Sequence, residues 1–322
     1  MKYEKEIFGL MGFTFVFPGQ GAQSIGMGQA LAKAYSKSRK VFEEVDDALD
    51  FKLSKLIWEG SIDDLTLTKN AQPALMATSI AAFRAMEEEN LMPDSINFFA
   101  GHSLGEYSAL CAAGALELSV TAKLLRIRGE AMQKAVPIGV GAMAAILGLD
   151  LKAVEDIAAQ AAQTQICQAA NDNDPNQVVI SGHFEAVERA IEIAKESGAR
   201  RAILLPVSAP FHCPLMQPAT DIMDEALSRV TIKQPISPIV ANYSAKPVIE
   251  PSDIKDSLVR QIMGRVKWRE SIEFLSNNGV KQVYEVGAGK ALSGMIKRVN
   301  KDISCQNISS PEDLNKILLK EN

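Results

Sequence analysis

The chain has 322 residues, of which 47% are hydrophobic and 23% are charged. This is the composition of a globular protein, and it excludes a disordered, collagenous or coiled-coil chain as the main architecture. The net charge is -5 and aromatic residues make up 6%, so neither a basic field nor a base-stacking surface indicates nucleic acid. The length allows one large domain with an insertion, or two domains of ordinary size.

Cysteine spacing and the most apolar segments bear on the compartment. The four cysteines lie far apart without a C-x-x-C pair, which favours a reducing environment over a disulfide framework or a zinc site. The most apolar stretch, residues 135–149, contains Pro137 and several glycines, and it is shorter than the roughly 20 residues of a membrane span. The first ten residues, MKYEKEIFGL, lack the apolar core of a signal peptide. We expect a cytoplasmic protein without membrane contact, in which residues 1–10 are an N-terminal extension.

Two strand-turn-helix units predict a parallel sheet. The apolar run FTFVF at 13–17 predicts a buried strand, which PGQGAQ ends before a helical stretch. A second apolar run at 96–100 ends in GHSLGEYSAL, a tight turn followed by a helix. Strands that alternate with helices favour a mostly parallel sheet covered on both faces. Further strands are expected at 239–243 and 282–286, and further helices at 254–263, 271–277 and after the GAGK turn.

The middle of the chain has a different order of elements. Strands are expected at 141–149, 166–170, 177–181 and 202–207, with helices at 151–163 and 184–197 and a turn over NDNDPN. The order β-α-β-β-α-β is typical of a ferredoxin-like unit. We therefore predict an inserted ferredoxin-like subdomain over 139–207, within a hydrolase-like α/β catalytic subdomain formed by 11–138 and 208–322.

GHSLG at 101–105 matches the G-x-S-x-G pattern at the junction of a strand and a helix. A serine at such a turn exposes its oxygen at the helix N-terminus, where the backbone N–H of Leu104 can face a developing oxyanion. Ser103 is therefore the candidate nucleophile. The alternative is a glycine-rich turn in which the serine only caps the helix.

A serine nucleophile needs a base, and the chain has three histidines. His183 begins an amphipathic helix, which favours a surface or capping role. His102 adjoins Ser103, but successive side chains diverge at such a turn, which favours a structural role. His212, in SAPFHCPLM where the chain returns to the main body, is the best candidate base. Cys213 beside it is best interpreted as a small buried residue.

Arg128 is expected to point inward from a helix spanning about 117–134. It lies four residues from both Leu124 and Met132, on the apolar stripe of that helix. An inward guanidinium is costly unless it meets an anion. Two anions are possible: a buried Asp or Glu of the protein, or the carboxylate of a substrate.

From about residue 11 onward the sequence resembles the malonyl-CoA:acyl carrier protein transacylases of bacterial type II fatty acid synthesis. Several separate motifs in the family's order carry this resemblance, which makes it more specific than one serine turn. The matching stretches are FPGQGAQ, QPAL, GHSLGEYSAL, Arg128–Met132 in RGEAM, GAMAAILGL, QVVISG, PFHCPLM, VRQ and YEVGAGK.

The resemblance implies a role for each matched residue. Ser103 would carry the acyl group and His212 would act as its base, in a dyad whose imidazole is oriented by the backbone carbonyl of Gln261. The N–H groups of Gln20 and Leu104 would form the oxyanion hole, and Arg128 would hold the malonate carboxylate. Phe211, Met132 and Asn173 would belong to the pocket.

The resemblance also implies the reaction and its partners. Malonyl-CoA would acylate the serine and release CoA, and the phosphopantetheine thiol of acyl carrier protein would then take the malonyl group, a ping-pong S-malonyltransferase mechanism. No metal or other cofactor would be needed, and the enzyme would be a monomer. Carrier proteins of this kind are acidic, so we expect a basic surface, either at residues 259–269 or around Lys195, Arg200 and Arg201.

Two positions depart from patterns found among related proteins. Ala288 stands where many members have proline, which indicates a structural change. Phe211 stands where some members have serine, and in related acyltransferase domains phenylalanine accompanies malonyl rather than methylmalonyl use. Its ring would crowd a branch at C2, although one methyl group gives only about 1–3 kcal/mol of discrimination.

Two other classes of protein share parts of this pattern. A serine esterase would have the same turn, but it would require an acid residue before the histidine and would have no use for an inward arginine. A non-catalytic module that binds acyl-CoA or carrier protein would be expected to lose the nucleophile or the base, and both are present.

Overall fold

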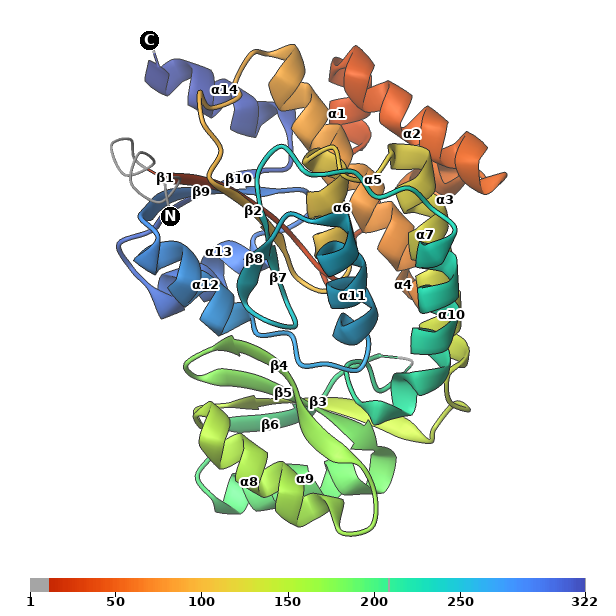
Figure 1. Ribbon diagram of the computed structural model, residues 1–322, viewed down its shortest axis with the longest axis vertical. Coiled ribbons are helices and arrows are strands. Elements are labelled where there is room, and N and C mark those ends of the chain that lie inside the picture. The colour runs from red at the N-terminus through yellow and green to blue at the C-terminus, as the bar shows by residue number, and fades with distance from the viewer. Residues whose placement is uncertain (1–11, 208, 322) are drawn as a thin grey trace.

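Two separate β-sheets organise the chain (Figure 1), and the computed structural model describes residues 12–207 and 209–321. The six-stranded sheet has the order β10-β9-β1-β2-β7-β8, and the four-stranded sheet has the order β4-β5-β3-β6. The strands of the first sheet are β1 (Gly12–Phe17), β2 (Phe98–Gly101), β7 (Ile239–Ala241), β8 (Lys246–Val248), β9 (Val280–Val286) and β10 (Ser304–Ile308). Those of the second are β3 (Gly141–Leu147), β4 (Cys167–Asp174), β5 (Gln177–His183) and β6 (Arg201–Leu204).

Helices cover both faces of the large sheet and one face of the small sheet (Figure 1). They are α1 (Gln29–Ala34), α2 (Ser36–Leu49), α3 (Leu53–Glu59), α4 (Ile62–Thr66), α5 (Thr68–Glu88), α6 (Gly105–Ala112), α7 (Leu118–Lys134), α8 (Leu151–Ala162), α9 (Phe184–Glu196), α10 (Gln217–Ser228), α11 (Pro251–Gln261), α12 (Trp268–Asn277), α13 (Ala291–Val299) and α14 (Pro311–Glu321). Among the described residues, no helix is long and apolar enough to cross a bilayer.

The large sheet is parallel except for its last pair, β7 and β8. Side chains of β1 alternate between two hydrophobic cores, as successive residues of a strand must. Phe13, Phe15 and Phe17 join the core of helices α5, α6 and α7, whereas Val16 joins the core of α12 and α13. Both faces are therefore buried, and the predicted α/β fold class is confirmed.

Parallel pairing of β1 with β2 brings two loops together. Phe17 is paired with Gly101 at the ends of the two strands, so the PGQGAQ loop and the GHSLG turn begin at the same edge of the sheet. The backbones then approach so closely that a Cβ on Gly105 would lie 2.2 Å from the carbonyl oxygen of Phe17. This edge is where parallel α/β sheets place their ligands.

The small sheet is antiparallel, and its order of elements is the predicted β-α-β-β-α-β. Helices α8 and α9 pack on the face turned away from the large sheet (Figure 1). Their apolar residues, including Val154, Ile157 and Val187, form a separate core with Ile146 and Ile180. The expected ferredoxin-like arrangement is confirmed, and residues 1–10, predicted to be an extension, lie outside the described residues.

The predicted turn over NDNDPN was wrong, because β4 continues through Asp174 and only Pro175 and Asn176 form the turn. Asp172, Asn173 and Asp174 are buried, which is unusual for a polar run. Each of these side chains has a partner outside the small sheet: Arg269 for Asp172, His102 of the GHSLG turn for Asn173, and Arg298 for Asp174. Long-range pairing therefore stabilises a strand that local composition predicts as a loop.

Strand β4 is also the main connection between the two sheets. Asp172 forms an ion pair with Arg269 of α12 at 2.9 Å, and Asp174 forms one with Arg298 of α13 at 2.7 Å. The backbones of Ala170 and Asp172 bond to both sides of Val266, with N···O distances of 2.8 and 2.9 Å. The small sheet is thereby held in a fixed position next to the site described below.

Replacing Arg269 with alanine should leave the buried Asp172 carboxylate without its charged partner. Burial already raises the pKa of Asp172, and Arg269 opposes that change. We expect the free energy of unfolding to fall by roughly 3 kcal/mol in urea denaturation. Arg260→Ala is the matched control, because Arg260 pairs with the exposed Asp256 and should cost less than about 1 kcal/mol. Equal losses would contradict the proposed anchoring role.

Candidate active site

Ser103 lies in the turn between β2 and α6, in a strained backbone conformation. Its φ angle is 53°, a left-handed conformation that costs a non-glycine residue about 1–3 kcal/mol. Asn242, just after β7, stabilises the turn from both sides: its Oδ1 accepts the N–H of Ser103 at 2.7 Å, and its Nδ2 donates to the carbonyl of Gly101 at 2.7 Å. The hydroxyl of Ser103 is thereby presented at the edge of the sheet.

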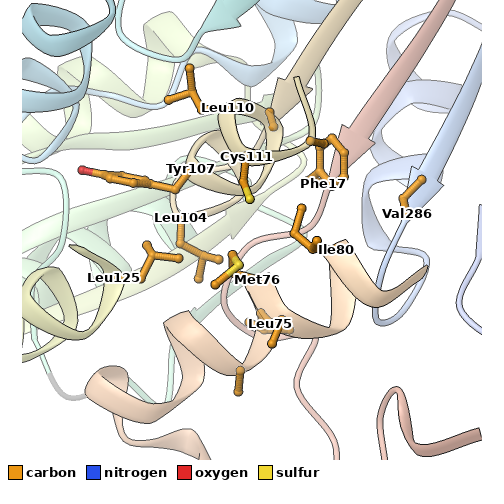
Figure 2. Close-up of a cluster of buried hydrophobic side chains, with 14 of the residues drawn as sticks. Phe17, Leu75, Met76, Ile80, Leu104, Tyr107, Leu110, Cys111, Leu125 and Val286 are labelled. Atoms are coloured by element: carbon orange, nitrogen blue, oxygen red, sulfur yellow. The ribbon is translucent and has the colours of Figure 1, made fainter. Parts of the chain in front are cut away.

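Leu104 anchors the same turn in the core. Its side chain is 1% exposed and extends toward Met76 and Leu125 (Figure 2). Leu104 belongs to the hydrophobic cluster that α5, α6 and α7 build against β1. Apolar packing therefore fixes the backbone directly after the candidate nucleophile.

His212 meets Ser103 at hydrogen-bond distance, with 2.9 Å between Nε2 and Oγ. Its Nδ1 lies 2.8 Å from the carbonyl oxygen of Gln261. A carbonyl only accepts, so Nδ1 carries the proton and Nε2 of the neutral ring is left to accept the proton of the serine. His212 also has a positive φ of 58°, and Gln168 of β4 donates to its carbonyl at 3.0 Å.

The imidazole of His212 is kept neutral by its surroundings. Burial, and then the positive charge of Arg128, lower its pKa to about 3. The ring is therefore in its basic form at neutral pH, as a general base must be. The partner of Nδ1 is a backbone carbonyl rather than the carboxylate found in a Ser-His-Asp triad.

Arg128 projects inward from α7 and is 1% exposed. Its Nη2 donates to Ser103 Oγ at 3.1 Å and to Gln261 Oε1 at 2.8 Å, and its Nη1 donates to Gln72 Oε1 at 2.8 Å. Its hydrogen-bond partners are thus neutral oxygens, and among the described residues no carboxylate lies within ion-pair distance of it. Among the residues that the structure describes, Nε has no hydrogen-bond partner.

A cavity of about 530 Å³ opens onto Ser103, His212 and Arg128. The remaining residues that line it are Gln20, Gly21, Gln23, Ile62, Thr66, Gln72, His102, Leu104, Met132, Met143, Asn171, Leu205, Pro206, Val207 and Phe211. Four predicted residues, Gln20, Leu104, Met132 and Phe211, are thus in the wall. The volume is within the range of small-molecule sites.

Two predicted residues lie behind the wall of the cavity rather than in it. Asn173 is 3% exposed, and its Oδ1 contacts His102 Nε2 at 2.8 Å, while Asn171 lines the cavity instead. Gln261 is fully buried and contacts the site through its carbonyl and its side-chain amide. His102 is part of the wall and bonds to Asn173, which supports the structural role inferred for it.

The N–H groups of Gln20 and Leu104 lie on the two loops that follow β1 and β2. Neither N–H donates a hydrogen bond to any residue that the structure describes. The loops are in close contact, because a Cβ on Gly19 would lie 2.6 Å from the carbonyl oxygen of His102. Gln20 and Leu104 also line the same cavity as Ser103, so their N–H groups remain the candidates for an oxyanion hole.

The other candidates have structural partners. His183 Nδ1 accepts the N–H of Ile166 at 2.9 Å. Cys213 is buried, its Sγ lies 3.2 Å from the carbonyl oxygen of Pro210, and burial raises the pKa of its thiol. No group of His, Cys, Asp or Glu among the described residues is arranged to hold a metal.

The cations of the basic segment at 259–269 are paired with acidic side chains. Each of its cations contacts an acid. Arg265 and Arg269 reach Glu155 and Asp172 on other elements, and the remaining pairs are local: Arg260 with Asp256, Lys267 with Glu270, and Arg269 with Glu273. The segment was predicted as one of two candidate basic surfaces for carrier protein, and the pairing of its cations makes it the less suitable of the two.

Sequence reasoning assigned no role to three residues that shape the site. Gln72 accepts a hydrogen bond from Arg128, and Asn242 holds the turn of Ser103. Gln168 donates to the backbone carbonyl of His212. The sequence contains one weak indication of a role for Asn242, because this polar residue directly follows a buried apolar strand. Nothing local distinguishes Gln168, because its partners lie on segments distant in sequence.

The known proteins that this chain resembles in sequence are acyl transferases. Residues 14–304 match the family model described as "Acyl transferase domain". The chain is 47% identical to the malonyl CoA-acyl carrier protein transacylase of Bacillus subtilis, covering 94% of each chain. It is 42% identical to the transacylase of Escherichia coli, covering 93% of this chain and 96% of the relative.

Solved structures agree with the sequence comparison. The acyl-carrier-protein-S-malonyltransferase of Bartonella henselae is similar with a TM-score of 0.94 and 54% identity, covering 96% of this chain and 99% of that one. A malonyl-transacylase solved in complex with its type II PKS acyl-carrier protein is similar with a TM-score of 0.93 and 40% identity, covering 97% of this chain and 100% of that one.

The low pKa of His212 predicts an unusual pH dependence for Ser103. Below the pKa of the base the ring is protonated and cannot accept the serine proton, so reactivity should persist down to about the lowered value. We expect the rate of inactivation by a fluorophosphonate to fall less than twofold between pH 7.5 and 5. A histidine of ordinary pKa would lose about 30-fold at pH 5. A midpoint near pH 6.5 would contradict the lowered value.

Proposed function

Since the chain belongs to the malonyl CoA-acyl carrier protein transacylase family, we propose that it transfers the malonyl group of malonyl-CoA to the phosphopantetheine thiol of acyl carrier protein in fatty acid synthesis, through a malonyl ester of Ser103. One observation carries the assignment of residues. Ser103 Oγ lies between a neutral imidazole at 2.9 Å and a buried guanidinium at 3.1 Å. The first can take its proton, and the second can recognise a carboxylate.

In the first half-reaction, Ser103 attacks the thioester carbonyl of malonyl-CoA. His212 Nε2 takes the hydroxyl proton as the C–O bond forms. The negative charge on the carbonyl oxygen is stabilised by the N–H groups of Gln20 and Leu104. The C–S bond then breaks, CoA leaves with the proton from His212, and the malonyl group remains as an ester.

The carboxylate of malonate is assigned to Arg128. The guanidinium has no acid partner of its own within ion-pair distance, so a bound carboxylate supplies the counterion that its burial requires. Charge-assisted hydrogen bonds to a carboxylate are about twice as strong as neutral ones. Arg128 therefore selects a donor that has a free acid over one that ends in a methyl group.

In the second half-reaction, the carrier thiol enters the cavity that CoA has left. His212 takes its proton, the sulfur attacks the ester carbonyl, and the same oxyanion site stabilises the second tetrahedral intermediate. The C–O bond breaks and Ser103 recovers its proton from His212. The chemistry is proton transfer and acyl transfer, which Ser103 and His212 supply themselves.

Carrier-protein contact is proposed near the small sheet. Arg200 and Arg201 are exposed at the start of β6, and the residues that follow β6, Leu205 to Val207, line the cavity. An acidic carrier protein held there would have its prosthetic arm close to the opening. The cations at 259–269 are less suitable, because they are already paired. We place the reaction in the cytoplasm and expect a monomeric enzyme without nucleic-acid or membrane partners.

Malonyl-CoA without an acceptor should label the protein at Ser103. Intact-protein mass spectrometry should show one malonyl adduct on the wild type and none on Ser103→Ala, because the covalent carrier is gone. Cys213→Ala, adjacent to the base, should still be labelled. If carrier protein is added, the adduct should disappear. Release of free malonate as fast as transfer to carrier protein would instead indicate an esterase.

Arg128→Ala should lower malonyl transfer more than acetyl transfer. Hydrogen bonds to charged groups contribute about 1.5–3 kcal/mol, so the ratio of malonyl to acetyl kcat/KM should fall by about 10- to 100-fold. Arg126→Ala is the control on the same helix, since Arg126 is half-buried and bonds to Asn70 away from Ser103. Equal losses on both donors would remove Arg128 from the selecting role.

A further inference from the structure

Glu106 is a buried carboxylate for which the proposed mechanism has no use. It lies in the first turn of α6, three residues after Ser103, and is 2% exposed. Burial raises its pKa to about 7, and hydrogen bonds from Asn242 and Gln261 oppose that change. A carboxylate is costly at such a place, and it lies next to the residues that hold Ser103.

A single oxygen of Glu106 connects two parts of the site. Oε2 accepts the backbone N–H of Asn242 at 3.0 Å and the side-chain Nε2 of Gln261 at 2.8 Å. Asn242 is the residue that holds the strained turn of Ser103. Gln261 is the residue whose carbonyl orients His212 and whose Oε1 accepts from Arg128.

The amide of Gln261 has a donor end and an acceptor end, and the site requires one orientation. Its Nε2 donates to Glu106 and also to the carbonyl of Ser103 at 3.0 Å. Its Oε1 faces the guanidinium of Arg128 at 2.8 Å. The reversed amide would place NH₂ against the guanidinium and an oxygen against two acceptors, so the acceptors at Glu106 and Ser103 determine the orientation.

We propose that Glu106 is a positioning residue, whose Oε2 fixes the orientation of the Gln261 amide and through it the position of Arg128 beside Ser103. The inference rests on the proposed role of Arg128 as the residue that recognises the malonyl carboxylate. Glu106 makes no contact with substrate in this scheme. Its effect on the reaction passes through Gln261, and its second bond, to Asn242, supports the same turn.

Two substitutions separate the reach of Glu106 from its charge. Glu106→Gln keeps an oxygen at the same distance but removes the charge, whereas Glu106→Asp keeps the charge and withdraws the oxygen by one methylene. The readout is the ratio of malonyl to acetyl kcat/KM for transfer to carrier protein, measured on full-length enzyme. We expect Asp to lower this ratio at least tenfold and Gln to retain at least a third of it.

The action through Gln261 is tested by a double-mutant cycle. Gln261→Ala removes the amide but keeps the backbone carbonyl that orients His212, so it should lower the ratio about as much as Glu106→Asp. In the Gln261→Ala background, Glu106→Asp should change the ratio less than threefold. Glu285→Asp is the matched control: Glu285 is another buried carboxylate, which accepts N–H groups at the start of α13, and its replacement should leave the ratio unchanged.

Several outcomes would overturn the inference. A ratio that falls with Gln and persists with Asp would make Glu106 a counterion of Arg128 rather than a positioning residue. Parallel losses on both donors, or a full effect of Asp in the Gln261→Ala background, would also overturn it. If Glu106→Asp does not fold, an unchanged ratio of malonyl to acetyl kcat/KM in Gln261→Ala would overturn the inference. An unchanged ratio in Arg128→Ala would instead overturn the proposed function on which it rests.

Discussion

The site depends on a positive charge that is buried beside a nucleophilic serine. Desolvation makes this costly, and the protein reduces the cost with neutral oxygens of Gln72, Ser103 and Gln261 instead of an ion pair. An internal carboxylate within ion-pair distance of Arg128 would compete with any substrate acid. In the proposed mechanism, this incomplete compensation leaves the guanidinium available to the carboxylate of malonate.

The same charge affects the base. Burial, and then the charge of Arg128, lower the pKa of His212, which keeps the imidazole neutral but also makes it a weaker base. In the proposed mechanism, proton transfer from Ser103 is then favourable only as negative charge is stabilised elsewhere, by the N–H groups of Gln20 and Leu104 and by Arg128 itself. A bound malonate carboxylate would partly neutralise the guanidinium and raise the basicity of His212. Recognition of the donor and activation of the serine are thus electrostatically coupled in the proposed mechanism.

Contacts from the rest of the fold hold the strained backbone of the site in place. Ser103 and His212 both have positive φ angles, and each is held by a side chain from a segment distant in sequence, Asn242 and Gln168 respectively. Asn242 can reach Ser103 because β2 and β7 are neighbours in the large sheet. Gln168 can reach His212 because β4 of the small sheet is anchored to α12 and α13. Both sheets are therefore needed to assemble one dyad.

These long-range contacts also mark the limit of what sequence could predict. Ser103 was identifiable because a strand-turn-helix junction is a local signal, and the inward direction of Arg128 because helical periodicity is local too. The burial of Asp172 and Asp174 was not predictable, since it depends on Arg269 and Arg298 of other helices. For the same reason the sequence could not show which strands are neighbours, and so which amides would hold the site.

In the proposed function, donor choice depends on two interactions of different strength. The ring of Phe211 in the cavity wall can disfavour a branched donor only by steric crowding, and one methyl group contributes about 1–3 kcal/mol to such discrimination. A missing carboxylate has a larger effect, because it leaves a buried cation without its counterion as well as removing hydrogen bonds. The proposed site should therefore discriminate more strongly against acetyl than against methylmalonyl donors. The orientation of one amide, that of Gln261, maintains the stronger of the two.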